Sequence, residues 1–242
     1  MKKPSILLAA YFALFSSALG SQQPAVAPAS QPVFSTAAAA ERIENLDTLK
    51  TELKQYHDCA CKCGCYAHDL DAQANRAIAF LRRRAAHPKA GEKLALILDI
   101  DETTLSNYQE LVKLDFGFDK AAFDAWALSA QAPAIPGTLR LFQEAKRLGV
   151  AVFFITGRTE DERDATARNL RNQGFEGWQQ LTLRNQAQAK QTAEKYKSAV
   201  RAQIVAQGYT LALNVGDQWS DLKGTPEAEY NVKYPDPFYY IP

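Results

Sequence analysis

Short apolar runs alternate with helical segments through most of this chain, and that alternation limits the folds open to it. The runs are bounded by glycine or polar turns, which is typical of parallel strands buried on both faces. We therefore expect strands at these positions. The clearest runs are Leu94–Ile100, Val150–Ile155 and Thr210–Val215, and weaker candidates are Leu181–Leu183 and, as an edge strand, Asn231–Tyr234.

Helical spacing of apolar residues marks the segments between these runs. Strands that alternate with helices favour a parallel sheet with right-handed crossovers. We predict a Rossmann-like three-layer α/β sandwich with a mostly parallel sheet. A small helical cap is expected from about 41–90 and from the aromatic-rich insertion 107–136 after the first strand. The predicted helices cover residues 41–56, 67–86, 138–148, 160–172 and 187–207.

Residues 1–20 have the pattern of a secretory signal peptide. Two lysines precede the apolar run Ile6–Leu14, and small residues follow at Ala18–Gly20. The alternative is an uncleaved anchor, although the run is short for a membrane span. We expect a periplasmic or secreted protein with no stable membrane span once the signal is removed.

Residues 21–40 are rich in Gln, Pro, Ala and Ser and are typical of a flexible leader. A single domain is expected over residues 41–242. The chain carries a net charge of +1, and no block of basic residues follows a face or a helix, so nucleic acid is not an expected partner. The sequence does not indicate an oligomeric state.

The first candidate site follows the first apolar run, in the segment Asp99–Asn107. In open α/β sheets, ligands bind beyond the carboxyl ends of the strands. Asp99 and Asp101 are two residues apart and point the same way while the chain stays extended. They repel each other unless a cation such as Mg²⁺ lies between them. A carboxylate nucleophile beside a second carboxyl group suits phosphoryl transfer through an aspartyl-phosphate, and a charged turn is the alternative.

Three further motifs occur after later strands or on the next helix. The hydroxyl of Thr156 and the N–H groups beside it can hold phosphate oxygens. Lys197 can neutralise a phosphate and its attacking carboxylate. Asp217 can complete a metal site, with Asp221 in support. Each motif alone also fits an ordinary turn or a solvated helix, but the order of all four is hard to reach by accident.

With Thr156 and Lys197 between them, the segments Asp99–Thr103 and Gly216–Leu222 resemble the haloacid dehalogenase superfamily. They are most similar to its subfamily IIIB acid phosphatases, which include bacterial class C acid phosphatases and plant vegetative storage proteins. The resemblance runs from about residue 41 to the end of the chain. Lys197 lies in the family-like context Tyr196–Ser198, which favours it over the rival lysines Lys190 and Lys195.

The resemblance implies a role for each site residue. Asp99 would attack phosphorus, while Asp101 would protonate the leaving oxygen and then activate water. Thr156 and Lys197 would hold the phosphoryl oxygens. The implied cofactor is Mg²⁺, and its ligands would be Asp99, the main-chain carbonyl of Asp101 and Asp217, with Asp221 orienting the metal shell.

The expected reaction is Mg²⁺-dependent hydrolysis of small phosphomonoesters by an acid phosphatase. A phosphotransferase and a non-catalytic storage or binding protein on the same fold remain the alternatives. Tyr108, Trp126 and Tyr239 are candidates for stacking on a nucleobase or phenyl leaving group, and packing into the core or cap is the other interpretation. Stacking would favour nucleoside monophosphates and aryl phosphates.

The four cysteines of the chain, Cys59, Cys61, Cys63 and Cys65, alternate along one short segment. In an oxidising compartment two disulfides are expected, with three possible pairings. A four-thiolate metal site is the competing interpretation, although zinc ligands are usually spaced by two or more residues. The family resemblance carries no information about this cluster.

Overall fold

A single sheet organises the part of the chain that the computed structural model describes, residues 43–59 and 65–242. Its strand order is β3-β2-β1-β4-β5, and every neighbouring pair is parallel. This confirms the predicted α/β fold, with a sheet that is parallel throughout and β5 at its edge. The strands are β1 (Lys93–Leu98), β2 (Ala151–Thr159), β3 (Gln180–Arg184), β4 (Tyr209–Gly216) and β5 (Tyr230–Lys233).

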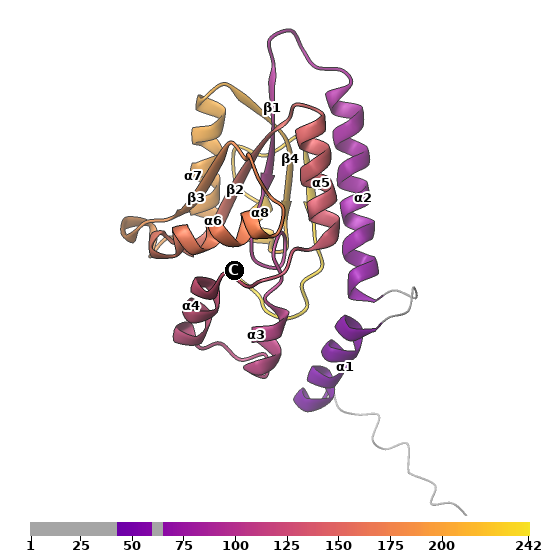
Figure 1. The fold of residues 1–242 in the computed structure, drawn as a ribbon, viewed down its shortest axis with the longest axis vertical. Coiled ribbons are helices and arrows are strands. Elements are labelled where there is room, and N and C mark those ends of the chain that lie inside the picture. The colour runs from indigo at the N-terminus through magenta and orange to yellow at the C-terminus, as the bar shows by residue number, and fades with distance from the viewer. Residues whose placement is uncertain (1–42, 60–64) are drawn as a thin grey trace, which may run out of the picture. The chain divides into compact units, whose positions relative to one another are not determined.

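Helices cover both faces of the sheet, as Figure 1 shows. On one face α2 (Tyr66–Ala85) packs against α5 (Pro136–Arg147) and the strands, and on the other lies α7 (Ala193–Ala206). The other helices are α1 (Leu46–Asp58), α3 (Tyr108–Lys113), α4 (Lys120–Ser129), α6 (Arg163–Asn172) and α8 (Trp219–Leu222), with 3-10 turns η2 (Glu160–Glu162) and η3 (Gln186–Gln188). None of these helices is both long and apolar enough to cross a membrane.

The central strand β1 is apolar on both faces because both faces are covered. Leu94, Leu96 and Leu98 join the core under α2 and α5, whereas Ala95 and Ile97 join the core under α7. Burying a side chain of leucine size stabilises the fold by about 1.5–3 kcal/mol. Continuous apolar sequence, rather than alternation, is therefore what this strand requires.

The register of the sheet brings the predicted site residues to one edge. Leu98 lies opposite Phe154 of β2 and Val215 of β4. The residues that follow these three positions therefore leave the sheet side by side. The N–H of Asp99 donates to the carbonyl of Val215 at 3.1 Å, which holds the start of the first loop against β4.

The insertion after β1 forms α3 and α4, which lie with α1 beyond the carboxyl ends of the strands (Figure 1). The Asp119 carboxylate caps the start of α4 by accepting from the N–H of Ala122 at 2.8 Å. Of the predicted cap segment 41–90, α2 packs against α5, β4 and β5, so this helix belongs to the sandwich layer.

The helix predicted over residues 187–207 begins later, at Ala193. The Asn185 side chain instead closes a separate 3-10 turn by accepting from the N–H of Gln188. The Thr192 hydroxyl then caps α7 by accepting from the N–H of Lys195. Local side-chain caps of this kind compete with helix continuation, which is why apolar spacing alone misplaced the start.

The predicted signal peptide 1–20 and leader 21–40 lie outside the described residues, as do Cys61 and Cys63. Export, disulfide pairing and metal binding by the cysteines all stay predictions.

Candidate active site

The segment after β1 folds tightly at the carboxyl edge of the sheet. The successive N–H groups of Thr103–Leu105 all donate to the carbonyl of Ile100, at 2.8 to 3.3 Å. Glu102 has a φ of 53°, a left-handed conformation that costs a residue with a Cβ about 1–2 kcal/mol. These turns determine the directions in which the side chains of Asp99 and Asp101 leave the strand.

Asp99 is buried and forms an ion pair with Lys197 of α7. The Lys197 ammonium also donates to Asp221 Oδ1 at 2.5 Å. Burial raises the pKa of Asp99 to about 7, with Lys197 opposing the rise and Asp221 adding to it. Burial would lower the pKa of Lys197, but the two carboxylates outweigh it and raise that pKa above its usual value. The lysine is therefore charged and aimed at the predicted nucleophile.

Asp217, directly after β4, completes a cluster of three buried carboxylates. One oxygen each from Asp99, Asp217 and Asp221 lies within 4.8 Å of the others. Thr103 Oγ1 and Gln218 Nε2 donate to Asp217 at 2.8 and 2.7 Å, and no basic side chain of the described residues is ion-paired with it. Burial, with the nearby carboxylates, raises the pKa of Asp217 well above its usual value.

The donor set of this cluster fits a divalent cation. Three carboxylates face the single ammonium of Lys197, which leaves two negative charges when all three are ionised. Hard carboxylate oxygens are the ligands that Mg²⁺ prefers. The predicted cluster contained Asp101, whereas the structure brings the carboxylate of Asp221 to this position. The predicted ligand role of the Asp101 main-chain carbonyl stays a prediction.

Asp221 reaches the cluster because the start of α8 packs closely against the end of β4. Its Oδ2 accepts from the N–H of Gln218 at 2.8 Å. A Cβ on Gly216 would lie 2.4 Å from the Asp221 Cβ, so only glycine allows this approach. The buried guanidinium of Arg201 donates to the main-chain carbonyls of Asp221 and Pro226 at 2.7 and 2.8 Å. These bonds fix the main chain of α8 and of the segment that follows it.

Asp101 is not part of the carboxylate cluster and is ion-paired with Arg158. Arg158 Nη2 and Nε donate to Asp101 Oδ1 at 2.8 and 3.1 Å. Burial raises the pKa of Asp101, but Arg158 and the amide of Asn107 outweigh it, so the pKa lies below its usual value. Thr156 is fully buried beside this pair, and its hydroxyl lies 3.5 Å from Asp101 Oδ2.

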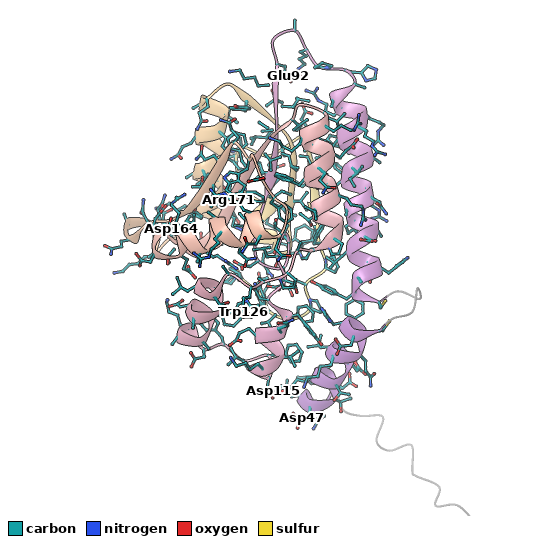
Figure 2. All side chains as sticks on the ribbon, in the orientation of Figure 1. Asp47, Glu92, Asp115, Trp126, Asp164 and Arg171 are labelled. Carbon is teal, nitrogen blue, oxygen red and sulfur yellow. The ribbon has the colours of Figure 1, made fainter. Side chains whose placement is uncertain are left out.

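Asn107 connects Asp101 to the cap. Its Nδ2 donates to Asp101 Oδ1 at 2.9 Å and to Glu102 Oε2 at 3.0 Å, and its Oδ1 accepts from Trp126 Nε1 at 2.8 Å. In Figure 2, Trp126 comes from α4 and lies on the side towards the ends of the strands. Asn107 therefore links the orientation of Asp101 to the position of α4.

Buried Glu102 and Gln218 hold the carboxyl-terminal segment, whose residues Tyr239, Tyr240 and Ile241 line the cavity. The Tyr239 hydroxyl donates to Glu102 Oε2 at 3.0 Å, and the N–H of Ile241 donates to Gln218 Oε1 at 3.1 Å. Burial and the neighbouring Asp101 raise the pKa of Glu102 to about 8. The Tyr239 hydroxyl is therefore hydrogen-bonded to a carboxyl group that keeps its proton at neutral pH.

These groups surround a cavity of about 530 Å³. Asp99, Asp101, Lys197, Asp217 and Asp221 line it, as do two of the three predicted stacking residues, Trp126 and Tyr239. Further aromatic lining that was not among the predicted stacking residues comes from Phe116, Phe118, Phe123 and Tyr240.

Tyr108, the remaining predicted stacking residue, does not line the cavity. Its ring stacks on His57 of α1, with centroids 3.3 Å apart and planes 10° apart, and it also contacts Phe116 and Phe238. The alternative interpretation, packing into the cap, describes Tyr108 correctly. An aromatic cluster between α1 and α3 needs a ring at this position, and sequence proximity to Asp99 does not decide where the ring points.

Sequence reasoning assigned no role to Arg158, Asn107 or Arg201. Arg158 lies two residues after Thr156, and Asn107 ends the segment that begins at Asp99. The sequence therefore brought both residues close to the predicted site but did not show which side chains they contact. Arg201 lies one helical turn after Lys197, and a buried arginine cannot be distinguished from a solvated one by spacing. Each role depends on a contact between residues 19 or more apart in sequence.

Comparison with known proteins gives several relatives, most of them from plants. Acid phosphatase 1 of Solanum lycopersicum is 43% identical over 148 residues, which cover 60% of this chain and 58% of the tomato protein. The stem 28 kDa glycoprotein of Glycine max is 34% identical over 73% of this chain and 70% of its own length. Vegetative storage protein 1 of Arabidopsis thaliana is 34% identical over 60% of this chain and 55% of its own length. The match to the tomato and Arabidopsis proteins thus spans little more than half of each.

A solved structure shares the fold. The class C acid phosphatase of Bacillus anthracis superposes with a TM-score of 0.66 over 81% of this chain and 86% of that chain, at 24% identity. The family model for acid phosphatases of HAD subfamily IIIB matches residues 16–242, nearly the whole chain. With the fold, the acidic edge of the sheet and this match in agreement, the chain belongs to the HAD superfamily, subfamily IIIB (acid phosphatase).

Proposed function

We propose that this chain is a Mg²⁺-dependent phosphomonoesterase that works through an aspartyl-phosphate on Asp99. The observation that carries the proposal is the environment of this residue. Asp99 ends β1, is ion-paired with Lys197 and lies within 4.8 Å of two further carboxylates at the base of an open cavity. A structural aspartate would need only its cationic partner, whereas Asp99 also faces two further carboxylates that could hold a cation and a cavity with room for a phosphoryl group and its leaving group.

The proposed first step forms a bond between an Asp99 carboxylate oxygen and phosphorus, and the bond from phosphorus to the leaving oxygen breaks. Asp101 gives its proton to that oxygen. In the second step Asp101 takes a proton from water, whose oxygen attacks phosphorus and releases Asp99 and inorganic phosphate. Arg158 holds Asp101 ionised, which suits the second step. The first step requires this ion pair to weaken when substrate is bound and Asp101 to take up a proton from solvent before it protonates the leaving oxygen.

Lys197 and Thr156 are the proposed ligands of the phosphoryl oxygens. Lys197 is charged and ion-paired with Asp99. Its positive charge would reduce the repulsion between the attacking carboxylate and a phosphate. Bound Mg²⁺ would supply further neutralisation of that charge, held by Asp99 and Asp217 with Asp221 beside them.

The proposed substrates are small phosphomonoesters with an aromatic leaving group. Trp126 and Tyr239 support this choice because their rings line the cavity, together with those of Phe116 and Phe123. Stacking on such rings is worth about 1–3 kcal/mol per base. Tyr108, buried against His57, is not part of this proposal.

The test is a phosphate-release screen of purified protein over nucleoside monophosphates, aryl phosphates and glycerol phosphate, with Mg²⁺ or with EDTA. We expect hydrolysis only with Mg²⁺, with higher kcat/KM for aromatic leaving groups. The matched variant Asp99→Asn should lose at least about a thousandfold in kcat, since the covalent route is removed.

Two results would contradict the proposal in different ways. No phosphate release from any ester would favour a non-catalytic storage protein, a role that the name of vegetative storage protein 1 gives to that relative. Transfer of phosphate to an added alcohol in place of water would favour a phosphotransferase.

A further inference from the structure

We propose that Arg184 forms a second anion-binding position in the cavity, which selects phosphomonoesters that carry a second anionic group on the leaving group. The inference rests on the proposed phosphomonoesterase activity and adds a substrate class to it. It follows from how the charges that line the cavity are paired.

Among the described residues, three basic side chains line the cavity, and two of them are already paired. Lys197 is ion-paired with Asp99 and Asp221, and Arg158 with Asp101. Arg184 is the third, and no acidic side chain of the described residues lies within ion-pair distance of it. Glu162 also lines the cavity, but its Oε2 accepts from the N–H and hydroxyl of Thr159.

The Arg184 guanidinium is held in place without being neutralised. It stacks on the ring of Tyr196, 4.9 Å from the ring centroid, and its Nη1 donates to the carbonyl of Gln191 at 3.0 Å. Its Nε is buried without a hydrogen-bond partner. Burial lowers the pKa of Arg184, as expected for a charge with no carboxylate nearby. A half-buried, preorganised guanidinium whose charge no carboxylate neutralises is suited to binding a carboxylate or phosphate.

The sheet sets the distance at which this anion would be bound. Arg184 ends β3, which is separated from β1 and Asp99 by β2 alone. Neighbouring strands lie about 4.8 Å apart, so the main chain of Arg184 is displaced sideways from that of Asp99 by about 10 Å. It also lies further along the strands, because Arg184 pairs with Thr159 whereas Leu98 pairs with Phe154. The long arginine side chain nevertheless lines the same cavity as Asp99 and Lys197, and a benzene ring would extend a carboxylate from the phosphoryl position towards it. The aromatic lining of the cavity would contact the ring between the two anionic groups.

The test measures hydrolysis of four aryl phosphates by the full chain with Mg²⁺. Three of them are phenyl phosphate, 4-carboxyphenyl phosphate and 4-carbamoylphenyl phosphate, which is the uncharged counterpart of the second. The fourth, 3-carboxyphenyl phosphate, places the carboxylate at a different position on the ring. The quantity measured is the ratio of kcat/KM for a carboxyphenyl ester to that for the carbamoylphenyl ester. One charge-assisted contact predicts a ratio of about 10 or more in the wild type.

Arg184→Gln should bring this ratio close to one, and Arg184→Lys should leave it in between, because lysine keeps the charge but loses the planar fork. The matched control is Arg171→Gln. Arg171 also stacks on an aromatic ring, Trp178, and Figure 2 shows it well away from Trp126 of the cavity. This control should keep the wild-type ratio.

The outcomes separate this inference from the proposed function. Hydrolysis of all esters with a wild-type ratio near one overturns the Arg184 inference alone, with no variant required. Equal loss of kcat/KM for every ester in Arg184→Gln also overturns it, because the arginine would then act on the shared phosphoryl group. No hydrolysis of any ester contradicts the proposed phosphomonoesterase itself.

Discussion

Neighbouring carboxylates in this site differ because their cationic partners differ. Asp99 and Asp101 are both buried, yet the pKa of Asp99 is raised and that of Asp101 is lowered. Asp99 shares Lys197 with Asp221, whereas Asp101 receives two donors from Arg158. Two aspartates two residues apart can therefore take different roles, one as nucleophile and one as proton carrier.

The close approach of Gly216 to Asp221 can be tested by adding a single Cβ atom at residue 216. In Gly216→Ala the new Cβ would meet the Asp221 Cβ at 2.4 Å, so Asp221 must move away from Lys197. We expect kcat to fall about tenfold or more, with a stability loss of about 1–3 kcal/mol. Gly208→Ala is the control, because its φ of 86° causes strain but its surroundings are open. Equal activity in both variants at equal folded fraction would contradict the role given to Asp221.

The raised pKa of Glu102 makes stability depend on pH. The folded protein keeps this proton up to about pH 8, whereas the unfolded chain releases it near the usual value of 4.5. The contribution of Glu102 is therefore complete below pH 4.5 and is lost as pH rises towards 8. Glu102→Gln cannot ionise, so its free energy of unfolding should fall less steeply over this range. Urea unfolding in EDTA at several pH values measures the free energy of unfolding of both proteins. If this free energy changes with pH equally in the wild type and in Glu102→Gln, Glu102 does not titrate in this range.

At the scale of elements, the sheet and a helical insertion after β1 could be predicted, but the contacts inside the cap could not. Buried parallel strands need continuous apolar sequence, so Leu94–Ile100 and Thr210–Val215 identified β1 and β4 and placed Asp99 and Asp217 at one edge. The cap depends on contacts between distant side chains, such as Tyr108 with His57 and Asn107 with Trp126. No period in the sequence records those contacts, and that is why Tyr108 was assigned to the wrong surroundings.

The link from α4 to Asp101 can be tested by removing one N–H. Trp126→Phe keeps an aromatic ring in the cavity but deletes the bond from Nε1 to Asn107. Freed from this bond, Asn107 would hold Asp101 less firmly, so kcat should fall several-fold with a small change in KM. Trp126→Ala should also raise KM for aryl esters. The control is Trp178→Phe, because Trp178 lies outside the cavity. If Trp126→Phe changed KM but not kcat, the link from Trp126 through Asn107 to Asp101 would be contradicted.

At the scale of the whole molecule, three separate elements meet at the metal position. Asp99 follows β1, Asp217 follows β4 and Asp221 lies in α8, so a bound cation would join parts of the chain more than 100 residues apart. A ligand that binds only the folded state stabilises it by mass action, by about 2.7 kcal/mol at one hundred times its Kd. Metal binding should therefore be visible in unfolding as well as in activity.

Thermal unfolding in Mg²⁺ and in EDTA measures this effect without any substrate. We expect Mg²⁺ to raise Tm by about 5–10 °C at saturating concentration, given about 2–4 °C per kcal/mol for a domain of this size. Asp217→Asn should abolish most of the increase. An unchanged Tm in the wild type at all Mg²⁺ concentrations would exclude the site formed by Asp99, Asp217 and Asp221.

The most direct measurement for the whole account is to trap the phosphorylated enzyme. Protein mixed with ³²P-labelled phenyl phosphate and Mg²⁺ is quenched in acid and digested with trypsin. We predict a hydroxylamine-sensitive label on the peptide 94–113, which contains Asp99 and Asp101, and no label in Asp99→Asn. Phosphate release without a labelled peptide, together with undiminished turnover in Asp99→Asn, would contradict Asp99 as the nucleophile.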